Sequence, residues 1–115
     1  MNLFYYLSTC DTCKRIIKEL QLPENVEMID IKKNPLTEDQ LNSLFSLSQS
    51  YGSLLNRRAQ KLKEIDKSNL SEEKIKTLLL THYTFLKRPV LLFKGELFIG
   101  NSKSTVEAAQ KKLHG

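Results

Sequence analysis

Two cysteines three residues apart form the part of this 115-residue chain best suited to do chemistry. The stretch Cys10-Asp11-Thr12-Cys13 follows a short apolar run and precedes apolar residues at helical spacing, which predicts a helix N-terminus. Unpaired amides and the helix dipole stabilise a thiolate there, so we expect the pKa of Cys10 to lie below that of a free thiol. Cys10, nearer the turn, is the expected attacking thiol, and Cys13 the expected resolving thiol.

The charges beside this pair act in both directions. Lys14 and Arg15 favour the thiolate, whereas Asp11 disfavours it. We expect the helix end and the two cations to prevail. The amides of residues 11 to 13 would form an anion-binding nest, with Thr12 and Lys14 beside the bound oxyanion.

Two other interpretations of the cysteines stay open. Both could be small buried apolar residues. A zinc site would need two more ligands, and the spacing of His82 and His114 from the cysteines fits no finger pattern, so we predict no metal. His82 continues an apolar helix face and is expected to be a partly buried structural residue.

Arginines supply two further candidate features. Arg88-Pro89 precedes an apolar run, where a proline bond can be cis, although an ordinary strand-initiating proline is the plainer interpretation. Arg57-Arg58 is either a surface pair or an oxyanion-binding pair of guanidinium groups.

The elements that would hold these residues predict a small mixed α/β sheet. A strand over 3–7, a helix over 11–21 and a strand over 26–31 form a β-α-β opening. After Pro89, runs at 90–93 and 97–99 predict a tight hairpin. A capping box at Ser104-Thr105-Val106-Glu107 predicts the start of a closing helix.

The middle of the chain predicts helices only. A capping box at Thr37-Glu38-Asp39-Gln40 opens a helix that Gly52 is expected to end. Apolar residues at spacings of three and four over 55–65 predict another helix, and Ser71 begins a third.

The composition and charge of the chain argue against several classes of protein. The net charge of +5 and the pI of about 9.3 permit anionic partners, but basic residues alternate with acids and no RNA-binding aromatic signature occurs, which argues against direct nucleic-acid binding. No run reaches the roughly 20 apolar residues of a membrane span, and we expect no secretory signal. Two cysteines are too few for a disulfide scaffold, so we expect a cytoplasmic protein.

Five stretches in a fixed order resemble the arsenate reductase / Spx family of thioredoxin-like proteins. They span nearly the whole chain and are Leu7–Lys14, Lys33–Leu41, Leu54–Arg58, Lys87–Val90 and Phe98–Gly100. The resemblance implies one thioredoxin-like domain over 1–115 (β-α-β, then β-β-α), a helical insertion at about 36–86, and a cis Pro89 beside the cysteine loop.

The resemblance also implies site residues. Cys10 matches the cysteine that attacks arsenate, and Arg88 matches the arginine before the cis proline. The second arginine of the family would fall on Asn56, with Arg57 adjacent, and the stretch matching the third, residues 99–103, holds no arginine. Cys13 stands where these reductases usually carry serine, whereas the Spx regulators carry two cysteines as a redox switch.

Two functions follow from this resemblance. The first is a thiol oxidoreductase acting on an oxyanion or a disulfide, with an external reductant such as glutathione, glutaredoxin or thioredoxin and no cofactor. The second is an Spx-like redox-sensing regulator that binds the RNA polymerase α subunit, with Gly52 at the contact. A third, non-redox possibility is a binding module with unreactive thiols.

Overall fold

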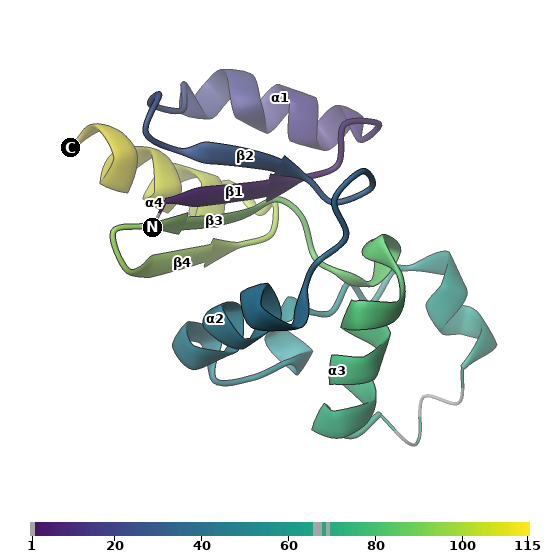
Figure 1. The fold of residues 1–115 in the computed structure, drawn as a ribbon. Coiled ribbons are helices and arrows are strands. Elements are labelled where there is room, and N and C mark those ends of the chain that lie inside the picture. Colours follow the sequence, from purple (N-terminus) through teal and green to yellow (C-terminus); the bar gives the residue numbers. More distant parts are fainter. Residues whose placement is uncertain (1, 66–67, 69) are drawn as a thin grey trace. The chain divides into compact units, whose positions relative to one another are not determined.

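The computed structural model describes residues 2–65, 68 and 70–115, and these divide into two compact units. The first unit contains residues 1–34 and 88–115, and the second contains residues 35–87. None of the helices among the described residues is long and apolar enough to cross a membrane. Figure 1 shows the elements of both units along the chain.

The first unit is built on a four-stranded mixed sheet in the order β2-β1-β3-β4. Its strands are β1 (Leu3–Tyr6), β2 (Glu27–Asp30), β3 (Val90–Phe93) and β4 (Glu96–Ile99). β1 pairs parallel with β2 and antiparallel with β3, and β3 pairs antiparallel with β4. The predicted β-α-β opening, the hairpin and the α/β class are confirmed.

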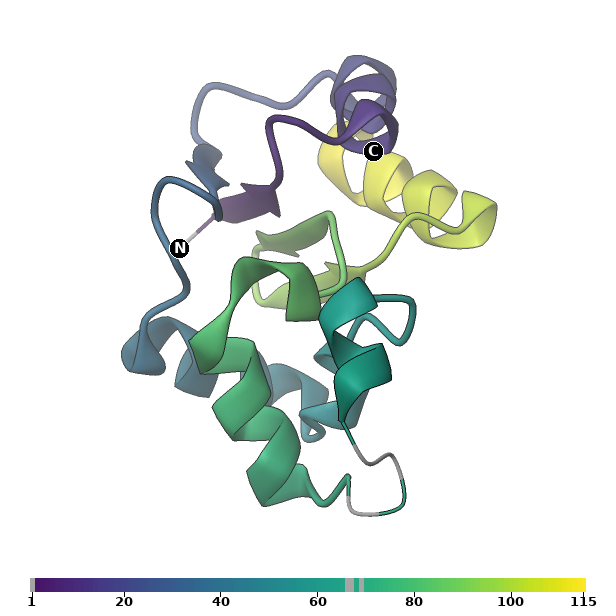
Figure 2. The same ribbon diagram turned by 90° about the vertical axis from the view of Figure 1, so that its right-hand side faces the viewer.

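Two helices cover one face of this sheet. They are α1 (Asp11–Leu20) and α4 (Lys103–His114), which lie side by side in Figures 1 and 2. Alternate strand residues meet them in one apolar core, because side chains two apart on a strand share a face. The buried members of this core are Phe4, Ile16, Leu20, Val26, Leu91, Phe93, Val106 and Ala109.

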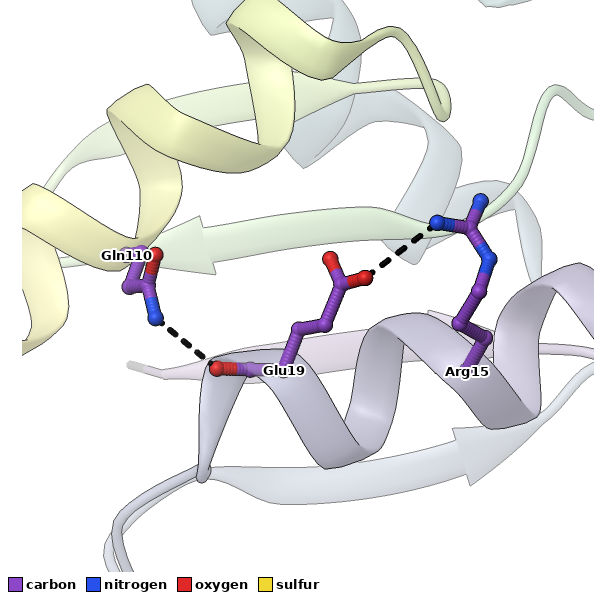
Figure 3. A network of polar contacts seen from close by, with 3 residues as sticks. All are labelled: Arg15, Glu19 and Gln110. Atoms are coloured by element: carbon purple, nitrogen blue, oxygen red, sulfur yellow. Dashed lines mark hydrogen bonds and ion pairs between the residues drawn. The ribbon is translucent and has the colours of Figure 1, made fainter.

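The last turn of α1 is tied to α4 by polar contacts (Figure 3). Gln110 Nε2 donates to the Glu19 carbonyl oxygen at 3.0 Å. In addition, His114 Nε2 contacts the Leu20 carbonyl oxygen. Arg15 Nη1 pairs with Glu19 Oε1 at 3.2 Å on the same face of α1. Helix α4 therefore satisfies carbonyl groups that the end of a helix leaves without intrahelical partners.

Among the residues that the structure describes, the second unit contains helices α2 (Glu38–Ser48) and α3 (Glu72–Thr81) and short 3-10 turns. These turns are η1 (Gly52–Leu54), η2 (Gln60–Glu64) and η4 (Tyr83–Phe85). The predicted capping box of α2 is confirmed, since Gln40 N donates to Thr37 Oγ1 at 3.1 Å and Thr37 N donates to Gln40 Oε1 at 3.0 Å. Ser71 caps α3, as predicted.

Two predicted boundaries are wrong. Helix α2 ends before Gly52, because Gln49 takes a left-handed conformation and its amide closes the helix on the Phe45 carbonyl. Helix α4 starts at Lys103, with Ser102 rather than Ser104 as its cap.

No α-helix forms over 55–65. Leu55 is extended and bridges Leu86, and the Asn56 side chain accepts from the Arg58 amide at 3.1 Å. Asparagine side chains that bond to nearby backbone compete with helix formation, so the segment forms a bridge and then the short turn η2.

We predict that Thr37→Ala destabilises the fold, because it removes the side-chain oxygen that accepts from the Gln40 amide. The expected loss is about 1 kcal/mol of unfolding free energy, measured by urea denaturation. Thr37→Ser keeps that oxygen and is the matched control. Equal stability of the alanine and serine variants would contradict this role.

Candidate active site

A tight turn delivers Cys10 to the start of α1. The Cys10 amide donates to the Leu7 carbonyl at 3.0 Å, and the Lys14 amide donates to the Cys10 carbonyl at 3.1 Å. Cys10 is thus the N-cap residue of α1, with φ −94° and ψ 116°. As predicted, Cys10 therefore lies at the N-terminus of a helix, where amides lack intrahelical partners.

The two sulfur atoms are close together and not bonded. Cys10 is half-buried, Cys13 is buried, and both are free thiols. The Cys10 sulfur makes no regular capping hydrogen bond. The amides of Cys13 and Thr12 and the Cys13 thiol nevertheless lie close enough to favour its ionised form.

The pKa of Cys10 lies below the ordinary value for a thiol. Burial alone would raise this pKa, but the Cys13 amide, the Cys13 thiol, the Arg88 guanidinium and the Thr12 amide together outweigh burial. The expected lowering is therefore confirmed. The responsible cation is Arg88, whereas we predicted Lys14 and Arg15.

Lys14 and Arg15 point to solvent, which explains why their charges do not set this pKa. The Lys14 side chain is 61% exposed, and its Nζ lies 4.0 Å from Asp11 Oδ1. Arg15 is also exposed and pairs with Glu19 one turn further along α1. Water screens such charges strongly.

The pKa of Cys13 is shifted in the opposite direction, to about 11. Burial is the main cause, and the hydrogen bond to Cys10 adds to it, while the Leu7 amide and Arg88 only partly compensate. Cys13 therefore keeps its proton near neutral pH and can donate it toward the Cys10 sulfur. The pair therefore contains a thiol that ionises readily, Cys10, and one helical turn away a thiol that stays protonated near neutral pH, Cys13.

Arg88 and Pro89 lie at the start of β3, in the same unit as the cysteines. The Arg88–Pro89 bond is cis, as the resemblance implies, and the Pro89 carbonyl accepts from the Gly100 amide at 2.9 Å. The half-buried Arg88 favours the ionised form of both sulfurs. Arg88 is therefore the cation of the site.

Arg57 belongs to the second unit. A methyl group added to Gly52 would lie 3.5 Å from Arg57 Nη2 and 3.3 Å from Glu72 Oε2. The Glu72 carboxylate accepts from the Gly52 amide at 3.1 Å and from the amide of the preceding residue at 2.7 Å. The role of Arg57 at an oxyanion stays a prediction, whereas Asn56 is engaged structurally and donates to the Thr84 carbonyl at 3.2 Å.

Sequence reasoning missed one residue near this site, Asp30. It is the last residue of β2 and opposes Tyr6, four residues before Cys10. The sequence feature that could have identified Asp30 is an acidic residue directly after the apolar residues of a strand. Among the described residues, no group of three or more His, Cys, Asp or Glu side chains could hold a metal ion.

We predict that Arg88→Met raises the pKa of Cys10, because it removes the cation that favours the thiolate. The Cys10 thiolate fraction at pH 7 should fall several-fold, measured as the rate of alkylation by iodoacetamide against pH, with peptide mapping to identify the sulfur. Lys87→Met, which removes the exposed neighbouring charge, should leave the profile in place. An unchanged profile for Arg88→Met would contradict this assignment.

This chain has relatives among known proteins of similar sequence or fold. A model of the ArsC family matches residues 5–109. The search of curated proteins found no match.

Several solved structures share the fold. An arsenate reductase (ArsC) related protein from Brucella melitensis is 26% identical with a TM-score of 0.72, covering 93% of this chain and 92% of its own. A possible arsenate reductase from Streptococcus mutans is also 26% identical, with a TM-score of 0.62 and coverage of 90% and 92%. An arsenate reductase from Vibrio cholerae, at 16% identity, a TM-score of 0.72 and coverage of 96% and 95%, shows the fold alone.

Proposed function

This chain belongs to the ArsC family, and from that premise we propose that it is a thiol oxidoreductase with Cys10 as nucleophile and Cys13 as resolving thiol. One observation carries the proposal: the pKa of Cys10 is lowered, while burial raises that of its neighbour Cys13 to about 11. The thiolate is the reactive form of cysteine. The asymmetry therefore supports Cys10 as the sulfur that attacks first.

With a disulfide substrate, the reaction transfers two electrons from the cysteine pair. The Cys10 thiolate attacks one substrate sulfur and forms a mixed disulfide, while the other substrate sulfur leaves as a thiolate and takes up a proton. Cys13 then loses its proton and attacks the Cys10 sulfur, which releases the second substrate thiol. The product is a Cys10–Cys13 disulfide, which an external thiol such as glutathione, glutaredoxin or thioredoxin reduces.

With arsenate, the same sulfurs act on arsenic. The Cys10 sulfur replaces one oxygen, which leaves as water. Attack by Cys13 on the Cys10 sulfur then breaks the sulfur–arsenic bond, and the electron pair stays on arsenic, which leaves as arsenic(III). The names of the relatives from Brucella melitensis and Streptococcus mutans support an oxyanion of this kind.

Arginines would hold the oxyanion charge during this reaction. Arg88 already favours the Cys10 thiolate, and we propose Arg57, Thr12 and Lys14 as further residues that bind the oxyanion. Arg57→Ala should then raise KM for arsenate roughly 10- to 100-fold, the effect of losing one charge-assisted hydrogen bond. The neighbouring exposed Arg58→Ala is the matched control, and equal effects of both variants would contradict a specific role for Arg57.

A second function has its own supporting observation. Residues 99–103 hold no arginine, and a second cysteine stands at position 13, which is the pattern of a redox-sensing regulator that resembles Spx. The product would then be a changed protein surface, recognised by the RNA polymerase α subunit, with Gly52 at the contact. Either function places the protein in the reducing cytoplasm and needs no cofactor.

One experiment separates the two functions. The purified protein is assayed with arsenate and, separately, with a glutathione mixed disulfide, and the Cys10 thiolate is titrated in the same preparation. Turnover with either substrate supports the enzyme. A reversible Cys10–Cys13 disulfide without turnover, together with binding of purified polymerase α subunit in one redox state only, supports the regulator. Ordinary, unreactive thiols would overturn both.

A further inference from the structure

Asp30 is a buried carboxylate at the end of β2. Its side chain belongs to a residue only 6% exposed, and it is the one charged residue buried to this degree in the described part of the chain. Burial of a charge is costly unless hydrogen bonds compensate for it. Its position therefore requires an explanation.

One carboxylate oxygen joins two backbone segments. Asp30 Oδ1 accepts from the Lys32 amide at 3.1 Å and, at the long end of the range, from the Ser8 amide at 3.5 Å. The Ser8 hydroxyl is the main cause of a lowered pKa for this carboxyl, so Asp30 stays ionised near neutral pH.

The second carboxylate oxygen of Asp30 has no stabilising hydrogen bond among the described residues. Asp30 Oδ2 is buried and accepts no hydrogen bond from any residue that the structure describes. A buried carboxylate oxygen that accepts no hydrogen bond costs free energy, so stability alone is a weak reason for a carboxylate here.

The contact between Asp30 and Ser8 connects Asp30 to the turn that holds Cys10. Asp30 opposes Tyr6 across the parallel β1–β2 pair, and the Ile31 amide donates to the Tyr6 carbonyl at 2.9 Å. Ser8 lies inside the turn that the Cys10 amide closes on Leu7. Asp30 therefore fixes the middle of the turn whose last residue is Cys10.

We propose that Asp30 is a positioning residue that holds Cys10 in line with the amides of the first turn of α1. Asp30 acts through the backbone of the turn rather than through its charge, since a nearby negative charge would disfavour the thiolate. This role rests on the proposed function, in which Cys10 is the nucleophile.

The test compares Asp30→Ala with Asp30→Asn in the full-length protein. Asparagine keeps an oxygen at the Oδ1 position, whereas alanine removes it. Because misplacement relative to the cap amides loses the energy of a cap interaction, Asp30→Ala should slow alkylation of Cys10 by iodoacetamide at pH 7 about 3- to 10-fold. Its pH profile should move upward, and Asp30→Asn should restore most of the rate.

Controls keep the outcome interpretable. Glu24→Ala removes an exposed carboxylate of the same unit and should leave the rate unchanged. If Asp30→Ala does not fold, Ser8→Ala removes the hydroxyl partner and should slow alkylation in the same direction. Lower thermal stability of Asp30→Ala with an unchanged Cys10 profile would overturn the proposal, as would a downward shift, which indicates a charge effect. An ordinary thiol profile in the wild-type protein would instead count against the proposed function.

Discussion

Replacement of Cys10 by serine should reduce turnover with arsenate or a mixed disulfide to background. A serine hydroxyl is not ionised near neutral pH and cannot form the mixed disulfide, so the expected loss in kcat is on the order of 10⁶-fold, as for loss of other enzymatic nucleophiles. The measurement is steady-state turnover with saturating external thiol.

The fold should survive this substitution, which makes the loss informative. Serine is a favoured N-cap residue, so α1 should start where Cys10 now caps it. Circular dichroism and thermal unfolding of the variant provide the control. Residual turnover above about one percent of wild type would show that Cys10 is not the attacking sulfur.

Replacement of Cys13 by serine should stop the reaction halfway with a disulfide substrate. Cys10 can still attack, but no second thiol follows within the protein, so a covalent adduct of one substrate thiol per protein should accumulate. Intact-mass spectrometry before and after addition of dithiothreitol measures this adduct and its release.

The double variant with serine at both positions separates the two thiols, since it should form no adduct. Serine at the buried position 13 is close in size to cysteine, so packing should change little. Full turnover of Cys13→Ser without accumulation of adduct would show that an external thiol, rather than Cys13, resolves the intermediate.

Local signals in the sequence predict much of this protein. The position of Cys10 at a helix start depends on a strand, a turn and apolar helix spacing that all lie within twenty residues. The capping box at Thr37 is equally local, and both are found in the structure. The hairpin after Pro89 follows from a change of apolar period, and it is also present.

The features that the sequence does not predict depend on contacts between distant segments. Local charge predicts that Lys14 and Arg15 favour the thiolate, whereas the cation that does so is Arg88, 78 positions after Cys10, and only the family resemblance indicates that Arg88 belongs to the site. Residues 55–65 have helical spacing, yet Leu55 pairs with Leu86, a partner that no local pattern indicates. The burial of Asp30 is likewise a property of the assembled sheet.

The contacts of Gln110 and His114 with the last turn of α1 have a mechanical consequence for oxidation. A disulfide brings two sulfur atoms to about 2.05 Å, so some backbone near Cys10 or Cys13 must adjust when it forms. The far end of α1 is anchored to α4 and to the apolar core through Ile16 and Leu20. Oxidation should therefore rearrange the chain upstream of the helix and leave its axis stationary, so that the two redox states differ at the end of the sheet where β1 finishes.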